Sequence, residues 1–460
     1  MAKIGIEKTS FTLDVLGRFT CNTDEEARAA TKRPDARPFD VIVIGGGSFG
    51  PILAENVYFD DKTHSRRVLV LEAGPMVLPE HQQNLPVLGG DIEKIVRDLP
   101  WAADGKLGFA GLRVMLGGRS AFFGGWSPQL LDDDKHTEMP RSRWPDAVVR
   151  ELKEVYLPRA AEQLAVDETN DFIFGDLHGI LRQRLAAGID RRDVEDAVPL
   201  DDLELHLKVP EGTSAADRRL LRLEAPLAVQ SKSPRPGFFP FNKFSTVPLI
   251  VRTAREAQFE VEKLLTDDAV VGQEGNFEGD DAKKRYMIVP RIVVAKLETA
   301  PGPDGELRVT NIKARRREPN GTEIDSDFPV AEGANVVIAM GTIESARLVL
   351  DSFSNLPNPE LVGSNFMAHL RSNVVMRIPR SSLPPGLPSE LQSSALFAKG
   401  VHEYQDGSGK GYFHLQITSA GLDNLTDDDH VELFMKVPDI DFYEDMIEAD
   451  DQHVVITIRG

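Results

Sequence analysis

The chain has 460 residues, 41% of them hydrophobic, and a formal net charge of −20 at pH 7. This length exceeds what one hydrophobic core usually organises, so we expect one large composite domain or two domains. The negative charge argues against a nucleic-acid partner, because phosphates require basic patches. The single cysteine, Cys21, excludes an internal disulfide framework and any cysteine-built metal site, and we expect no metal.

The N-terminal region carries no targeting signal that we recognise. Residues 1–38 read as a polar leader without identifiable chemistry, and no apolar region follows a basic one as a secretory signal would require. No apolar stretch in the sequence reaches the ~18 residues of a membrane span. A cytoplasmic location is the resulting expectation.

A β-α-β unit is predicted directly after the leader. Continuous apolar runs at 39–44 and 67–74 are typical of parallel strands that are covered on both faces. A helix is predicted between them, from about residue 48 to residue 58. The two strands and the helix together have the size expected of a β-α-β unit.

Three glycines between the first strand and the helix match the dinucleotide-binding pattern G-x-G-x-x-G. Gly45 permits the tight turn, Gly47 lets the backbone approach a pyrophosphate, and Gly50 packs the helix on the strand. The pyrophosphate would lie on unpaired N–H groups at the positive end of the helix, beside Ser48 and Phe49. The same letters also match a hydrolase nucleophile elbow around Ser48.

Glu72 is the first residue that favours the dinucleotide interpretation over the hydrolase one. It ends the second strand, about 20 residues after the glycine loop, where a carboxylate accepts hydrogen bonds from ribose hydroxyls. A carboxylate there disfavours a 2′-phosphate, so NADP is not expected. The hydrolase alternative is set aside on Glu72 and on the further motifs below, whereas the glycine pattern alone does not separate FAD from NAD.

The rest of the chain alternates helical and β-rich stretches. Helices are predicted at 144–166 and 214–230, and residues 167–285 hold no recognisable motif. A β-rich stretch begins near residue 287 and contains a predicted hairpin turn at Asn320-Gly321, and the apolar strand 334–341 leads into another helix. Beyond it the chain alternates strands and turns, with a hairpin turn at DGSGKGYF and an acidic run that we interpret as a solvated loop.

Four motifs, in order, resemble the glucose–methanol–choline (GMC) family of FAD-dependent oxidoreductases. The second strand ends in Glu72-Ala73-Gly74, and glycine-rich signatures follow at 117–120 and 124–126. The stretch 336–350 resembles the family's late strand-turn-helix. A final element is matched by Gly363, Asn365, Met367 and His369. The resemblance covers roughly residues 39–130 and 285–375, and it implies FAD as the cofactor.

The resemblance also implies where the cofactor would bind. It places glycines and Ser120 beside the flavin and its linker, a backbone valine at the adenine (Val294, with Val293 an equally good choice), and the strand-end Gly341 on the other side. Phe122 and Phe123 stand where some members tether the flavin covalently, so we expect noncovalent FAD. The predicted cofactor-binding residues are Gly45, Gly47, Ser48, Phe49, Gly50, Glu72, Ala73, Gly117, Gly118, Ser120, Gly124, Gly125, Val294 and Gly341.

No catalytic residue is predicted in this chain. In the family a histidine within His-x-x-Gly-Thr removes the hydroxyl proton, and none of the ten histidines has that context. The sequence ends on the strand-like HVVITIRG. The expectation is that the catalytic histidine lies beyond the C-terminus, either in a segment missing from this chain or on a partner chain.

The predicted fold is α/β: a discontinuous, Rossmann-like FAD-binding domain with an α+β substrate domain built on an antiparallel sheet. The predicted activity is FAD-dependent oxidation of a CH–OH group in an alcohol or sugar-like substrate; the alternative is a flavin-binding subunit whose catalytic segment lies elsewhere. The substrate, the electron acceptor and the oligomeric state are left open. The expected segments are a leader (1–38), FAD-binding parts (39–145 and 286–366) and substrate-domain parts (146–285 and 367–460).

Overall fold

The computed structural model describes residues 20–32, 37–82, 112–132, 135, 137–166, 173, 175–230, 242–267, 283–318, 320–366, 371–387, 392–421 and 452–460. These residues form two compact units that interleave along the chain. Described residues up to 122 and from 245 to 366 belong to the first unit, and those from 123 to 244 and from 371 onward belong to the second. No helix in the described part is long and apolar enough to cross a membrane.

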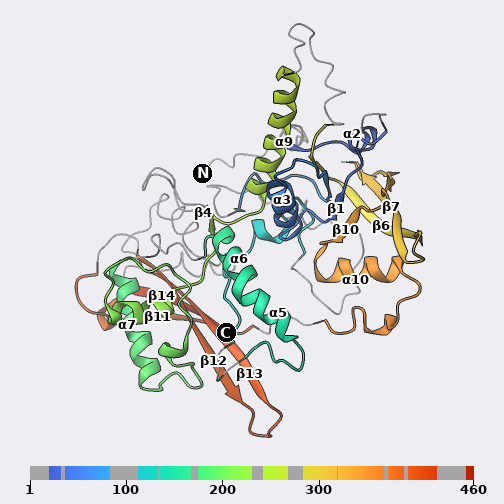
Figure 1. The fold of residues 1–460 in the computed structure, drawn as a ribbon. Coiled ribbons are helices and arrows are strands. Elements are labelled where there is room, and N and C mark those ends of the chain that lie inside the picture. Colours follow the sequence, from blue (N-terminus) through green and yellow to red (C-terminus); the bar gives the residue numbers. More distant parts are fainter. Residues whose placement is uncertain are drawn as a thin grey trace. The chain divides into compact units, whose positions relative to one another are not determined.

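A four-stranded parallel sheet organises the first unit (Figure 1). Its strands lie in the order β10 (Asn335–Ile338), β1 (Val41–Ile44), β2 (Val68–Leu71) and β5 (Tyr286–Val289). Helix α3 (Gly50–Asp60) connects β1 to the parallel β2. The predicted strand-helix-strand order is therefore confirmed, with the strands shorter than the apolar runs that contain them.

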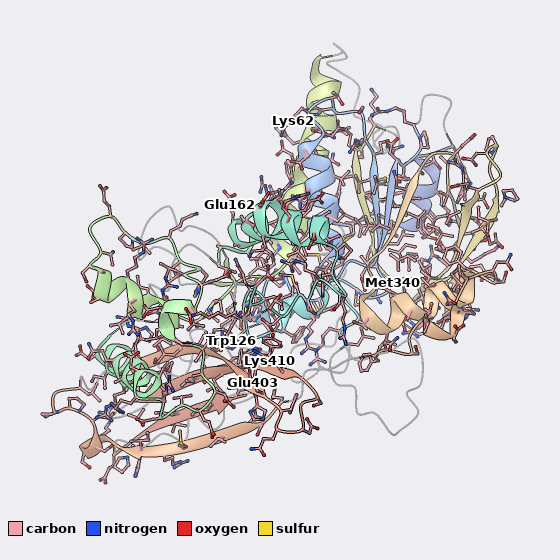
Figure 2. The ribbon with its side chains drawn as sticks, turned by 60° about the horizontal axis from the view of Figure 1, so that its bottom comes forward. Lys62, Trp126, Glu162, Met340, Glu403 and Lys410 are labelled. Carbon is pink, nitrogen blue, oxygen red and sulfur yellow. The ribbon has the colours of Figure 1, made fainter. Side chains whose placement is uncertain are left out.

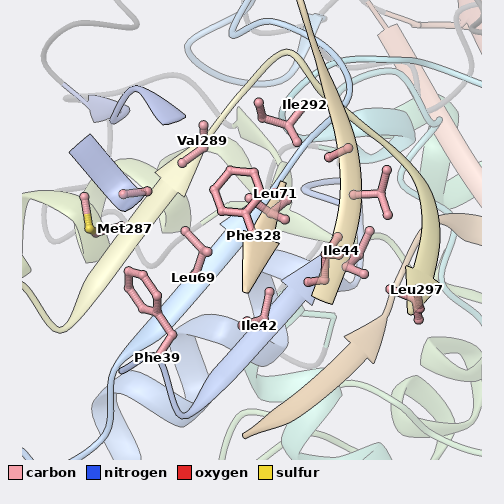
Figure 3. Close-up of a cluster of buried hydrophobic side chains, with 14 of the residues drawn as sticks. Phe39, Ile42, Ile44, Leu69, Leu71, Met287, Val289, Ile292, Leu297 and Phe328 are labelled. Atoms are coloured by element: carbon pink, nitrogen blue, oxygen red, sulfur yellow. The ribbon is translucent and has the colours of Figure 1, made fainter. Parts of the chain in front are cut away.

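Both faces of this sheet are buried, which explains why β1, β2 and β5 are continuously apolar. One face packs against strands β6 (Ile292–Pro301) and β7 (Leu307–Arg317) and the segment around Phe328 (Figure 3). The other face packs against α3 and α9 (Val247–Asp267). Alternate residues of β1 show the division, since Ile42 and Ile44 join the first cluster while Val41 and Val43 join the second.

A second, antiparallel sheet of the first unit contains β6 (Ile292–Pro301), β7 (Leu307–Arg317), β8 (Glu323–Asp325) and β9 (Phe328–Pro329). The predicted turn at Asn320-Gly321 connects β7 to β8. Helix α10 (Gly341–Ser352) follows β10 and packs along β6. In the leader, α2 (Asp24–Ala29) begins at a Thr23–Glu26 capping box, a helix that the sequence patterns did not predict.

An antiparallel sheet organises the second unit, in the order β11 (Asn373–Pro379), β14 (His453–Arg459), β13 (Lys410–Gly421) and β12 (Gln392–Glu403). The predicted hairpin turn joins β12 to β13, and the Glu403–Lys410 ion pair closes it at 2.8 Å (Figure 2). Helix α7 (Asp176–Asp190) packs on β12. The short pair β3 (Val229–Gln230) and β4 (Asn242–Lys243) completes the strands described in this unit.

The predicted helix at 144–166 is present as α5 (Asp146–Glu151), a π-helical turn (Leu152–Tyr156) and α6 (Leu157–Leu164). The prediction of a helix at 214–230 was wrong over its second half. Helix α8 spans only Ala215–Leu220 and a 3₁₀ turn Leu221–Leu223 follows. Pro226 disfavours helical geometry at the residue before it, and the chain there is extended and buried.

The boundaries of the two units also differ from the predicted segments. Residues 123–145 belong to the second unit instead of the glycine-loop unit, and α9 belongs to the first unit instead of the segment 146–285. Helix α9 lies beside α3, as Figure 1 shows, and its apolar face covers the parallel sheet. Residues 167–285 carry no motif that would have marked this return to the first unit.

Candidate functional site

A cleft of about 300 Å³ opens in the first unit where the parallel strands end. This is the place at which open α/β sheets bind ligands, and the volume is at the lower end of the usual ~300–1,000 Å³ of ligand pockets. Five separate stretches of the chain converge there. The lining residues come from the ranges 44–49, 71–73, 112–119, 292–294 and 339–344.

The glycine loop forms one wall of the cleft. Gly45 has φ +112°, a conformation that favours glycine, and a Cβ there would lie 2.3 Å from the Ala339 carbonyl oxygen. Gly50 begins α3 directly over the strand, where a Cβ would lie 1.9 Å from the Gly45 oxygen. At Gly47, by contrast, a Cβ would meet only the Gly118 Cα, at 3.9 Å. The space beside Gly47 therefore belongs to the cleft.

Gly117 and Gly118 lie directly against this loop. The Gly117 amide donates to the Gly46 carbonyl at 2.8 Å, and a Cβ on Gly118 would come within 2.8 Å of the Gly47 Cα. The resemblance implied a close approach between this glycine pair and the flavin. In the structure the missing side chain of Gly118 is already required for the close approach of two protein backbones.

Two helix N-termini open onto the cleft. Phe49 at the start of α3 and Met340 (labelled in Figure 2) at the start of α10 make no side-chain capping hydrogen bond. First-turn N–H groups have no partner within a helix and carry partial positive charge, which suits anions such as phosphates. Arg113 and Arg119 also line the cleft and add positive charge.

Glu72 lines the cleft and is only 7% exposed. Its Oε2 accepts from the Gly46 amide at 2.7 Å, and its Oε1 accepts from the Gly74 amide at 2.8 Å. The carboxylate thus supports the glycine loop and retains lone pairs for a further donor. Burial raises the pKa of Glu72 to about 7, although the amides of Gly74, Gly46 and Ala73 act in the opposite direction.

This raised pKa predicts a pH-dependent stability of the ligand-free chain. A carboxyl with a pKa of about 7 when folded and 4.5 when unfolded favours the folded state below pH 4.5, and that contribution is lost as the pH rises through 7. The loss amounts to about 3 kcal/mol at most. Urea unfolding between pH 5 and 8 should show this decline in wild type and a flatter profile in Glu72→Gln; identical slopes would contradict the assignment.

A row of buried hydroxyls positions the same loop from behind. Ser120 donates to the Gly117 carbonyl at 2.6 Å and lies 3.0 Å from the Thr246 hydroxyl. Thr246 in turn donates to the Gly47 carbonyl at 3.0 Å. Thr246 was not predicted from sequence, because it lies in a stretch without a motif, 199 residues from Gly47 in the chain.

Thr246→Val should therefore weaken the glycine loop while keeping the branched shape of the side chain. Removing the hydroxyl leaves the Gly47 carbonyl without this donor, which should cost about 1 kcal/mol of stability and weaken binding of the predicted FAD about 10-fold. Thermal unfolding and FAD titration measure the two effects. Thr253→Val is a control, because its hydroxyl bonds only within α9, to Leu249; equal affinity losses in both variants would contradict a role for Thr246.

The predicted cofactor-binding residues divide into three groups. Nine line the cleft: Gly45, Gly47, Ser48, Phe49, Glu72, Ala73, Gly118, Val294 and Gly341. Gly50, Gly117 and Ser120 lie behind it as packing and hydrogen-bonding positions. Gly124 and Gly125 belong to the second unit and do not line this cleft. Glu344 lines the cleft as well and was not predicted.

The second unit contains a smaller cavity of about 40 Å³. His206 and Lys399 both line it, together with Phe397, and the His206 Nε2 has no hydrogen-bond partner among the described residues. Burial lowers the pKa of His206 to about 4, so the ring is neutral at pH 7. The cavity has room for only one or two water molecules.

Other predicted features lie outside the described residues, namely Met367, His369 and the acidic run 423–451. His414 and His453, two of the ten histidines, lie in strands β13 and β14. The described residues contain no group of three or more His, Cys, Asp or Glu side chains that could hold a metal ion.

Comparisons with known proteins give only distant similarity. No family model and no curated protein matches the sequence. A fungal aryl-alcohol oxidase structure aligns with 68% of this chain at 12% identity and a TM-score of 0.34, and the chain spans about half (48%) of that protein. A variant of formate oxidase from Aspergillus oryzae RIB40, studied for FAD modification, aligns with 92% of this chain and 72% of its own at 13% identity and a TM-score of 0.40. The described residues form a mixed α/β protein with a parallel sheet, antiparallel sheets and a cleft at the strand ends.

Proposed function

We propose that the chain is an FAD-dependent oxidoreductase of the GMC type, acting on the CH–OH group of an alcohol or a sugar-like substrate. The observation that carries the proposal is the convergence of the glycine loop, Glu72, the 117–119 segment and the start of α10 on one cleft. These stretches are far apart in the sequence and were each predicted to contact one cofactor. When bound, FAD would accept the hydride of the substrate at flavin N5.

The cleft residues suit the parts of a dinucleotide in different ways. The N-terminus of α3, with Gly47 open to the cleft, would hold the pyrophosphate. Glu72 would accept a hydrogen bond from a ribose hydroxyl, using lone pairs that its amide donors leave free. Arg113 and Arg119 would neutralise phosphate charge. The FAD is proposed to be noncovalent, because Phe122 and Phe123 offer no nucleophile.

The direct test is flavin binding by the purified chain. After reconstitution with FAD and removal of excess, the protein should show flavin absorption bands in the visible region. Precipitation with acid should release the flavin into the supernatant, as noncovalent binding requires. A colourless protein after reconstitution would overturn the proposal, and flavin that remains in the pellet would overturn its noncovalent part.

A second experiment separates the enzyme from a flavin-binding subunit. The FAD-loaded chain is mixed under anaerobic conditions with primary alcohols, polyols and aldoses, and its absorption near the flavin band is followed. Bleaching by one substrate class would support oxidation of CH–OH groups by this chain. A flavin that none of them reduces would favour the alternative, in which catalytic residues come from another polypeptide.

A further inference from the structure

Glu344 is a buried carboxylate whose hydrogen bonds are incomplete. It lies in the first turn of α10, is 7% exposed, and lines the cleft. Its Oε2 accepts from Arg347 Nε at 2.9 Å. Its Oε1 is buried and has no hydrogen-bond partner among the residues that the structure describes. Buried polar atoms are nearly always paired, so this oxygen indicates a donor that the chain itself does not supply.

The edge of strand β6 presents the complementary group beside Glu344. β6 is an edge strand of its sheet, and the bond from the Arg317 amide to the Arg291 carbonyl fixes which residues face β7. By the alternation of an antiparallel ladder, Ile292 and Val294 point their N–H and C=O groups away from β7. Ile292 confirms this direction, because its amide donates to the Glu72 carbonyl at 2.7 Å.

Arg347 connects Val294 to Glu344. Its Nη2 donates to the Val294 carbonyl at 2.9 Å while its Nε holds Glu344 Oε2. The Val294 carbonyl therefore has a partner, and its N–H faces the open side of the strand. One side of the cleft thus offers a backbone donor at Val294 and a carboxylate acceptor at Glu344, one guanidinium apart.

This donor–acceptor pair has the pattern of one purine edge. Adenine carries an acceptor at N1 next to the donor N6 amino group, whereas hypoxanthine carries a donor at N1 next to the acceptor O6. We infer that Glu344 is the residue that recognises the cofactor's adenine, accepting from the N6 amino group while the Val294 amide donates to N1. This inference rests on the proposed function, in that it assigns the adenine end of the dinucleotide to this part of the cleft.

The test compares ADP with inosine diphosphate, which differ only at this edge of the base. Calorimetric titration of the FAD-free chain should show ADP bound at least about 10-fold more tightly than inosine diphosphate, because O6 would face a carboxylate. In Glu344→Gln, Arg347 holds the amide oxygen and turns the NH₂ group toward the cleft. The ratio should then fall to about one or invert.

Asp351→Asn is the matched control. Asp351 accepts from the same Arg347 at 3.0 Å but is exposed and does not line the cleft. Its ADP-to-inosine-diphosphate ratio should equal that of wild type. If Asp351→Asn lowers the ratio as much as Glu344→Gln does, the effect comes from Arg347 and the inference is overturned.

Further results bear on the assignment of Glu344 to adenine. Equal weakening of both nucleotides in Glu344→Gln would mean that the carboxylate acts on a hydroxyl or on the fold, and would overturn the inference. If Glu344→Gln does not fold, the wild-type ratio alone decides, since no preference for ADP overturns it. If wild type binds FAD but does not prefer ADP, the inference on adenine is overturned and the proposed function stands. If wild type prefers ADP but binds no flavin, the proposed function is overturned and the recognition of adenine by Glu344 stands.

Discussion

Gly47→Val is expected to abolish FAD binding while leaving the chain folded. A Cβ at Gly47 would meet only the Gly118 Cα, at 3.9 Å, and the Gly47 backbone is not in the left-handed region. The valine side chain would occupy the cleft at the N-terminus of α3 instead of colliding with the protein. FAD affinity should fall at least about 100-fold, or about 2.7 kcal/mol, in a fluorescence titration. The melting temperature without FAD should stay near that of wild type.

Gly50→Ala gives the opposite result and serves as the comparison. Its Cβ would lie 1.9 Å from the Gly45 oxygen and 3.1 Å from Val43 Cγ1, so the start of α3 must shift. The unfolding free energy itself should fall, by about 1–3 kcal/mol or more. A folded Gly47→Val protein that binds FAD like wild type would show that the cleft is not the dinucleotide site.

The parts of this site that sequence predicted are those with local physical causes. The glycine spacing follows from one tight turn and one helix start, and the apolar runs of β1 and β2 follow from burial on both faces. Gly45, Gly47 and Gly50 therefore have separate steric roles that their spacing alone predicts. The turn at Asn320-Gly321 was predictable for the same reason, because an Asn-Gly pair favours a tight hairpin turn by itself.

The parts that sequence did not predict depend on contacts across long separations. Thr246 reaches Gly47 only because α9 returns to the parallel sheet, and nothing local to residues 214–250 indicates that return. Glu344 looks like an ordinary helix residue in the sequence. Its importance comes from one buried oxygen without a partner among the described residues, which only the packing of α10 on β6 brings about.

A buried polar network in the second unit provides the other large effect. Glu224 is 2% exposed and accepts from His178 Nε2 at 3.0 Å and from Arg182. His178 Nδ1 lies 2.9 Å from the Ser394 hydroxyl on β12. Because an ionised carboxylate only accepts, His178 donates from Nε2, and both ring nitrogens are occupied within the core. The row of Ser394, His178 and Glu224 therefore connects α7 to the antiparallel sheet.

Glu224→Ala should destabilise the second unit by about 3–5 kcal/mol, because His178 and Arg182 would lose the carboxylate they share in a buried site. Burial would raise the pKa of Glu224, but His178 and Arg182 hold it below its usual value. The carboxylate's contribution is therefore present above the unfolded-state pKa of 4.5 and lost as the pH falls through the lower folded-state pKa. Urea unfolding at pH 7 and at lower pH should show a difference in unfolding free energy between wild type and Glu224→Ala that narrows in acid.

Glu211→Ala is the control, because Glu211 is exposed. Its unfolding free energy should stay within about 0.5 kcal/mol of wild type. A loss in Glu224→Ala no larger than this would contradict the role of the network.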